Sequence, residues 1–77
     1  MIQKKVKLNV IEDVKSFTVA AADYAFDIDV RSGKYVIDAK SLMGLFSLNL
    51  SEPVNVEIFA SEAEAEEFLN KIKELII

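Results

Sequence analysis

Four segments of the chain have the apolar and polar pattern of β-strands. Three of them alternate apolar with polar residues, as expected for strands with one buried face, and the fourth is a short run of β-favouring residues. The apolar positions are Val6, Leu8 and Val10; Phe26, Ile28 and Val30; the run Tyr35–Ile37; and Val54, Val56 and Ile58. Ser32-Gly33 is a turn signal between the second and third segments, so these two are predicted to form a hairpin.

Two of the intervening segments change to the apolar spacing of three and four that is typical of helices. Val14, Phe17 and Ala21 follow the acidic pair Glu12 and Asp13, and acidic residues suit the positive end of a helix. A second, short helix is predicted to begin at Ser41, where the chain reads AKSLMGLFSLNL from Ala39 to Leu50. The segment from Asn49 to Pro53 should end it.

The last part of the chain predicts a third helix with a strong start signal. Ser61 and Glu64 have the S-x-x-E spacing of a capping box. A continuous apolar stripe follows at helical spacing: Ala65, Phe68, Leu69, Ile72, Leu75 and Ile76. The helix is therefore expected to continue through this stripe.

The resulting element order, β-α-β-β-α-β-α, predicts a single domain spanning residues 1–77. We expect an α+β, open-faced, two-layer sandwich in which three helices cover one face of a four-stranded antiparallel sheet. The other face should be solvated, as antiparallel sheets allow. Its polar residues are predicted to be Lys5, Lys7, Asp27, Asp29, Asn55 and Glu57.

Composition narrows the classes of function. The chain has 77 residues, 52% hydrophobic and 29% charged, which is typical of a globular domain. A net charge of −4 argues against nucleic acid as a partner, and no apolar run is long enough to cross a membrane. The absence of cysteine favours a reducing cytoplasm. Without cysteine or histidine, no metal site or cofactor is expected.

The middle of the chain resembles the HPr family, the histidine-containing phosphocarriers of bacterial sugar phosphotransferase systems. The resemblance is closest from Asp27 to Leu50: the Ser32-Gly33 turn precedes Lys40-Ser41-Leu42-Met43-Gly44 and Phe46-Ser47-Leu48 at the family's spacing. The predicted element order also agrees with that family. The resemblance implies the same fold and a protein that binds other proteins.

The N-terminal third departs from the family pattern. The family carries its active-site histidine just before the first helix, followed by an arginine and a proline. The corresponding segment here, Asn9–Val14, has none of these residues, and the whole chain contains no histidine. A phosphoimidazole therefore cannot form on this chain. We expect a regulatory or docking module that is not an enzyme, with phosphotransferase-system components or a carbon-control regulator as partners.

Two alternatives remain open at this point. A carboxylate could replace the histidine as phosphoryl acceptor, and Asp13, beside Glu12 and Lys15, is the nearest candidate. The simpler interpretation of these residues is the solvated first turn of a helix. The second alternative is a structural homodimer, so the expected oligomeric state is a monomer or a weak homodimer.

Ser41 and the apolar residues after it are the candidate functional residues. Ser41 is predicted to cap the short helix, and the resemblance implies that it is a regulatory phosphorylation site. A short helix has room on its buried side for about half of its residues, so some apolar ones should face water. Leu42, Met43 and Phe46 are predicted to form the docking patch. The alternative is that all of them belong to the core.

Overall fold

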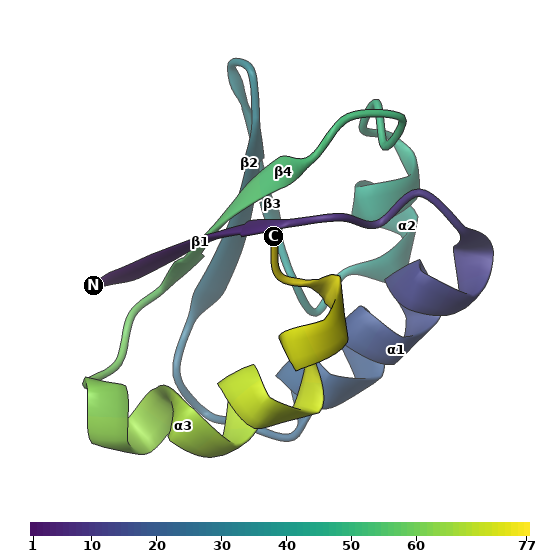
Figure 1. Cartoon of the computed structure of the whole chain (residues 1–77). Helices are drawn as coiled ribbons and strands as arrows, with labels where there is room; N and C mark the ends of the chain where they lie inside the picture. Colours follow the sequence, from purple (N-terminus) through teal and green to yellow (C-terminus); the bar gives the residue numbers. More distant parts are fainter.

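The computed structural model describes residues 1–77 as a four-stranded antiparallel sheet with three helices on one face (Figure 1). The strands are β1 (Ile2–Val6), β2 (Ile28–Ser32), β3 (Tyr35–Asp38) and β4 (Val54–Ile58), in the sheet order β1-β4-β2-β3. The helices are α1 (Ile11–Ala22), α2 (Leu42–Phe46) and α3 (Glu62–Lys71). The predicted fold class and element order are confirmed.

The core lies between the sheet and the helices. Val30 of β2 and Val56 of β4 are register partners on the covered face and are fully buried. From the helix layer, Phe17 of α1 and Phe68 of α3 fill this space with their ring centroids 6.0 Å apart. Every buried residue is apolar, and together they form one cluster. A single core of this kind agrees with the compact size of the chain.

The opposite face of the sheet is open and polar. Lys5 pairs with Asn55 in register, and Asp29 pairs with Glu57, so these four predicted residues do share the open face. Arg31 crosses from β2 to β4 and donates from Nε to the Glu57 carboxylate at 3.3 Å. The other two predicted open-face residues, Lys7 and Asp27, lie just outside the strands.

The hairpin between β2 and β3 forms as predicted. Ser32 pairs with Tyr35 across a two-residue loop, Gly33-Lys34. Gly33 has a φ of 59°, whereas no other residue of the chain has a positive φ. A positive φ at the first loop position alone is typical of a type II′ turn, which matches the twist of the two strands and favours glycine there.

The first strand lies earlier in the chain than its alternation predicted. β1 ends at Val6, where its register with β4 ends at Val54. Leu8 is still buried, but Val10 is half exposed and forms the N-cap position of α1. The alternation therefore identified the inward-facing residues correctly up to Leu8. The prediction that Val10 lies on the strand is wrong, because β4 has no residue left to pair with it.

The third helix is shorter than its apolar stripe predicted. α3 ends at Lys71, a turn of 3₁₀-helix follows at Lys73–Leu75, and Ile76 forms an isolated antiparallel bridge with Val6. Lys7 N–H donates to the Leu75 carbonyl at 2.8 Å, and Ile77 N–H donates to the Lys5 carbonyl at 2.9 Å. The backbone leaves the helix because the outer edge of β1 offers these hydrogen bonds.

None of the three helices has the length and apolar character needed to span a bilayer.

Candidate functional site

Ser41 caps α2 as the sequence predicted. It has an extended backbone, with φ −101° and ψ 97°, and its Oγ accepts a hydrogen bond from Gly44 N–H at 3.2 Å. Asp38 holds the chain before the cap, because its carbonyl accepts from Ser41 N–H at 2.9 Å and its Oδ1 accepts from Lys40 N–H at 2.8 Å. The Ser41 side chain is exposed, so the cap lies at the surface.

Gly44 allows α2 to pack closely on β3. A Cβ atom added at Gly44 would lie 2.7 Å from Cγ2 of Ile37 and 2.9 Å from Oγ of Ser41. Glycine inside a helix normally costs stability relative to alanine. The close approach of the Ile37 side chain explains why glycine occupies this position.

The apolar residues of α2 and the turn after it divide between core and surface. Leu45 and Leu48 are buried, and Leu42 packs against the core while remaining partly exposed. Met43 is 81% exposed and Phe46 is 44% exposed. Of the predicted docking patch, the structure therefore places Met43 and Phe46 on the surface and Leu42 at its buried margin.

Two further apolar residues lie exposed at the start of α1. Val10 is 48% exposed and Ile11 is 59% exposed. α1 and α2 are in contact, and Thr18 of α1 donates to the Ala39 carbonyl at 3.2 Å, close to the start of α2. Figure 1 shows α2 at the same end of the molecule as the first turn of α1. We call Val10, Ile11, Met43 and Phe46 the α1–α2 surface.

Sequence reasoning did not include Val10 and Ile11 in this surface. Val10 was assigned to the strand by alternation, and Ile11 precedes Val14 by three residues, which would place it on the buried stripe. The feature that exposes both is the position of the chain at the uncapped start of α1. Val10 makes no side-chain cap, and no pattern of residue types predicts that conformation.

The two acidic residues considered as alternative phosphoryl acceptors lie in the first turn of α1. Glu12 is exposed and Asp13 is partly buried. Asp13 N–H donates to the Val10 carbonyl at 3.1 Å, as in an ordinary helix start. Neither carboxylate belongs to a group of three or more side chains that could hold a metal ion.

A separate cluster of polar contacts joins the end of α1 to α3. The Tyr24 hydroxyl donates to Glu67 Oε1 at 2.9 Å, and burial together with this bond raises the pKa of Tyr24. Lys71 Nζ donates to Asp23 Oδ2 at 3.0 Å, and this bond, with a contribution from Tyr24, raises the pKa of Lys71. These contacts fix the two helices against each other, at the ends remote from the start of α1.

Comparison with solved structures shows that the chain shares the fold of three phosphocarrier proteins. HPr-C-His from Thermoanaerobacter tengcongensis superposes with a TM-score of 0.77 and 23% identity, covering 99% of this chain and 91% of that one. The phosphocarrier protein HPr from Bacillus anthracis gives 0.69 and 23%, covering 96% and 95%. The histidine-containing phosphocarrier protein of Mycoplasma gives 0.69 and 12%, covering 95% and 86%.

Comparison by sequence identifies the family. No curated protein matches the chain. The family model described as the PTS HPr component phosphorylation site matches residues 14–77, which is most of the chain and includes the predicted motif around Ser41. The chain therefore belongs to the HPr family of phosphotransferase-system phosphocarriers.

Proposed function

We propose that this chain is a regulatory or docking module of the phosphotransferase system that does not itself carry a phosphoryl group on histidine. The observation that carries the proposal is the combination of the family match over residues 14–77 with a sequence that contains no histidine. The α2 region common to the family is kept, while the imidazole that would accept the phosphoryl group is missing.

The exposed part of α2 supports a docking role. Met43 and Phe46 expose large apolar side chains on α2, and Val10 and Ile11 expose two more at the start of α1, at the same end of the molecule. Exposing such residues together is unfavourable unless a partner covers them, and grouped apolar side chains commonly mark an interface. Methionine suits such a surface because its flexible side chain adapts to different partners. The partner is proposed to be a phosphotransferase-system component or a carbon-control regulator.

Ser41 is proposed to regulate this docking by phosphorylation. Its hydroxyl is exposed next to Leu42 and Met43, and a phosphate there would add about two negative charges at the margin of the α1–α2 surface. The capping bond from Gly44 N–H could be kept by a phosphate oxygen, so the fold should survive. Ser61 provides an internal control for the specificity of phosphorylation, because it is also a helix cap. Its Oγ accepts a hydrogen bond from Glu64 N–H at 3.2 Å.

A binding measurement with matched variants tests the docking proposal. Calorimetric titration of the chain into the first enzyme of the phosphotransferase system, its serine kinase and a carbon-control regulator should detect at least one complex. Phe46→Ala and Met43→Ser together should weaken that complex about tenfold or more, equivalent to about 1.4 kcal/mol. Phe59→Ala is the matched control, since Phe59 is 46% exposed in the loop between β4 and α3, away from α2.

Two results would contradict the proposal. The first is the absence of binding to all three proteins. The second is an equal loss of affinity in the variant with both Phe46→Ala and Met43→Ser and in Phe59→Ala, which would show that the α1–α2 surface has no special role. The proposed phosphorylation is tested by mass spectrometry after incubation of the chain with the serine kinase. Phosphate should be found on Ser41 and not on Ser61. An unmodified Ser41 would contradict the proposal that phosphorylation of this residue regulates docking.

A further inference from the structure

The outer edge of β1 is only partly covered by the C-terminal segment. The Lys5 carbonyl accepts from Ile77 N–H, and Lys7 N–H donates to the Leu75 carbonyl, both on the side away from β4. In an antiparallel strand, the N–H and C=O of one residue point to the same side, and alternate residues share that side. The N–H and C=O of Gln3 therefore also point to the outer edge, where no strand of this chain pairs with them.

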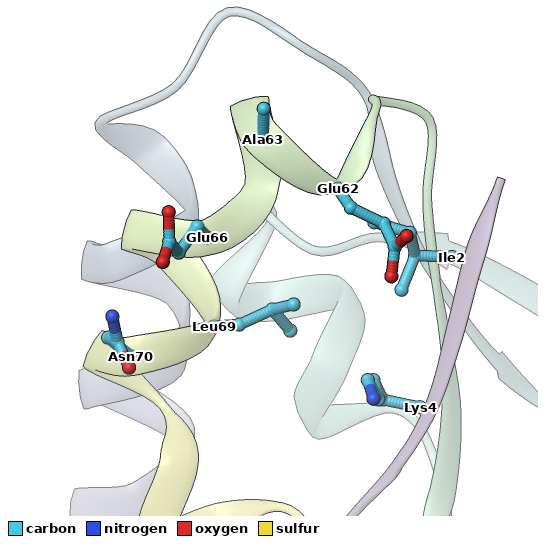
Figure 2. Close-up of a pocket in the computed structure, with 7 residues that line it drawn as sticks. All are labelled: Ile2, Lys4, Glu62, Ala63, Glu66, Leu69 and Asn70. Atoms are coloured by element: carbon cyan, nitrogen blue, oxygen red, sulfur yellow. The ribbon is translucent and has the colours of Figure 1, made fainter.

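A hollow of about 480 Å³ lies beside this free part of β1. Ile2 and Lys4 line it from the strand, and α3 lines it from the other side with Glu62, Ala63 and Leu69 among its residues. Figure 2 shows the Leu69 side chain pointing from α3 toward β1, with space between it and Lys4, and the Glu62 side chain pointing toward Ile2. Three of the seven lining residues are apolar, and two of these, Ile2 and Leu69, are only partly buried. The hollow therefore exposes apolar surface beside the polar residues of its lining, which are Lys4, Glu62, Glu66 and Asn70.

The C-terminal segment shows which direction an added strand would take. Ile76 bridges Val6 in antiparallel register, so an extended segment continuing that line would face Lys4, Gln3 and Ile2 in turn. The residue opposite Gln3 would exchange two main-chain hydrogen bonds with it and place its side chain on the open face beside Lys5. The residues on either side of it would point toward the hollow.

The charges on β1 select the occupant. Lys4 and Lys5 are exposed, and neither is in an ion pair. Lysines at a sheet edge oppose pairing with a second copy, because two β1 strands would bring four lysines together. An acidic residue opposite Gln3 would instead lie diagonally next to Lys5, while apolar neighbours would cover Ile2 and Leu69.

From these observations we propose that β1 and α3 form a second docking site, which binds an extended apolar-acidic-apolar segment of a partner protein as an added antiparallel strand. The site lies outside the α1–α2 surface and uses main-chain hydrogen bonds, as in other cases of strand addition. A partner could therefore contact the chain at two separate places.

Titration of the ¹⁵N-labelled chain with the peptide Val-Glu-Val-Thr-amide, followed by NMR, tests this site. The first valine of the peptide would lie opposite Lys4, because Ile77 already occupies the place opposite Lys5. We expect the largest amide shift changes at Gln3 and Lys5, with smaller ones at Leu69. The same peptide with lysine in place of glutamate should bind several-fold more weakly. Equal binding of the two peptides, or no shift at Gln3 with either, would overturn the proposal, as would a concentration-dependent dimer that gives the same shifts without peptide.

Gln3→Pro isolates the main-chain contact. Proline removes the outward N–H of Gln3, a change that an edge strand tolerates when that N–H faces away from the sheet. The variant should lose the peptide-induced shifts and keep the thermal midpoint within a few degrees. Gln3→Thr retains the N–H and should bind as the original chain does. If Gln3→Pro fails to fold, hydrogen exchange in the unsubstituted chain gives the same decision. The peptide should slow exchange of the Gln3 amide, and an unchanged exchange rate would overturn the proposal.

Discussion

The helices α2 and α3 of this small domain both begin with a serine N-cap, but only α3 has a complete capping box. Ser41 and Ser61 each accept a hydrogen bond from the backbone N–H three residues later, at 3.2 Å in both cases. In α3 the third residue is Glu64, whose carboxylate accepts from Ser61 N–H at 2.9 Å and completes a capping box. In α2 the third residue is Gly44, and the backbone N–H of Ser41 donates to the Asp38 carbonyl instead.

The difference shows how local and tertiary demands compete for one position. In α3 the third residue points to solvent, so a glutamate can reach back and stabilise the helix start. In α2 the corresponding Cβ would collide with Ile37 of β3, so the position serves close packing. α3 is thus stabilised by its own sequence, whereas α2, with five residues, depends on the sheet beneath it. This dependence leaves the outer side of α2 free to expose Met43 and Phe46.

Gly44→Ala should have the largest effect on stability among the changes that probe this comparison. The added methyl group must displace Ile37 Cγ2, which is held close to the backbone of β3. We expect the free energy of unfolding to fall by about 1–2 kcal/mol, because overpacking outweighs the better helix propensity of alanine. Urea denaturation followed by circular dichroism measures the change.

A double-mutant cycle identifies the cause of that loss. Ile37→Ala removes the atom that the new methyl group would meet, so Gly44→Ala should cost much less in the Ile37→Ala background. In α3, where the helix surface is exposed, alanine should be more stabilising than glycine. Ala63→Gly should therefore lower the free energy of unfolding by about 1 kcal/mol. A Gly44→Ala variant as stable as the original chain would show that α2 is not held by close packing.

Removing each serine cap should give the next largest effect. Ser61→Ala loses one bond of the capping box, and we expect a loss of about 1 kcal/mol. Ser41→Ala should cost about 0.5 kcal/mol, because α2 is held mainly by Leu45 and by contact with β3. Thermal unfolding of the two variants side by side measures the difference. An equal or larger loss in Ser41→Ala would mean that the short helix depends on its cap after all.

The sequence predicted the fold well because its signals were local and agreed with each other. The capping box at Ser61, the cap at Ser41 and the turn at Gly33 each specify a boundary through the chemistry of one or two residues. The limits of β1 and α3 were not predicted. Helical spacing identifies which residues face the core, but Ile76 reaches the core from a bridge to Val6 and not from a helix. That choice depends on hydrogen bonds between the two ends of the chain.

The candidate site was predictable only in part, for a related reason. The number of apolar residues after Ser41 exceeded what one face of a short helix can bury, so an exposed group could be expected. Which residues are exposed depends on how α2 lies on the sheet, and Gly44 sets that through its contact with Ile37. The contribution of Val10 and Ile11 depends on where the irregular segment before α1 turns, which alternation does not reveal.

The smallest expected effect is a dependence on acid pH in α3 that α2 lacks. The Glu64 carboxylate accepts hydrogen bonds from Ser61, first from its backbone N–H and then from its side chain, and these lower the pKa of Glu64. Because the folded pKa lies below that of the unfolded chain, the stabilisation is present above the ordinary glutamate pKa of about 4.3 and is lost as the pH falls through the lower folded value.

NMR titration of the Glu64 carboxyl carbon should report this lowered pKa. In Ser61→Ala the pKa should rise but remain below the ordinary value, since the backbone N–H stays in place, and Glu64→Gln should keep the acceptor while removing the dependence. A Glu64 pKa that returns fully to the ordinary value in Ser61→Ala would assign the effect to the hydroxyl alone, and the reciprocal backbone bond would no longer distinguish α3 from α2.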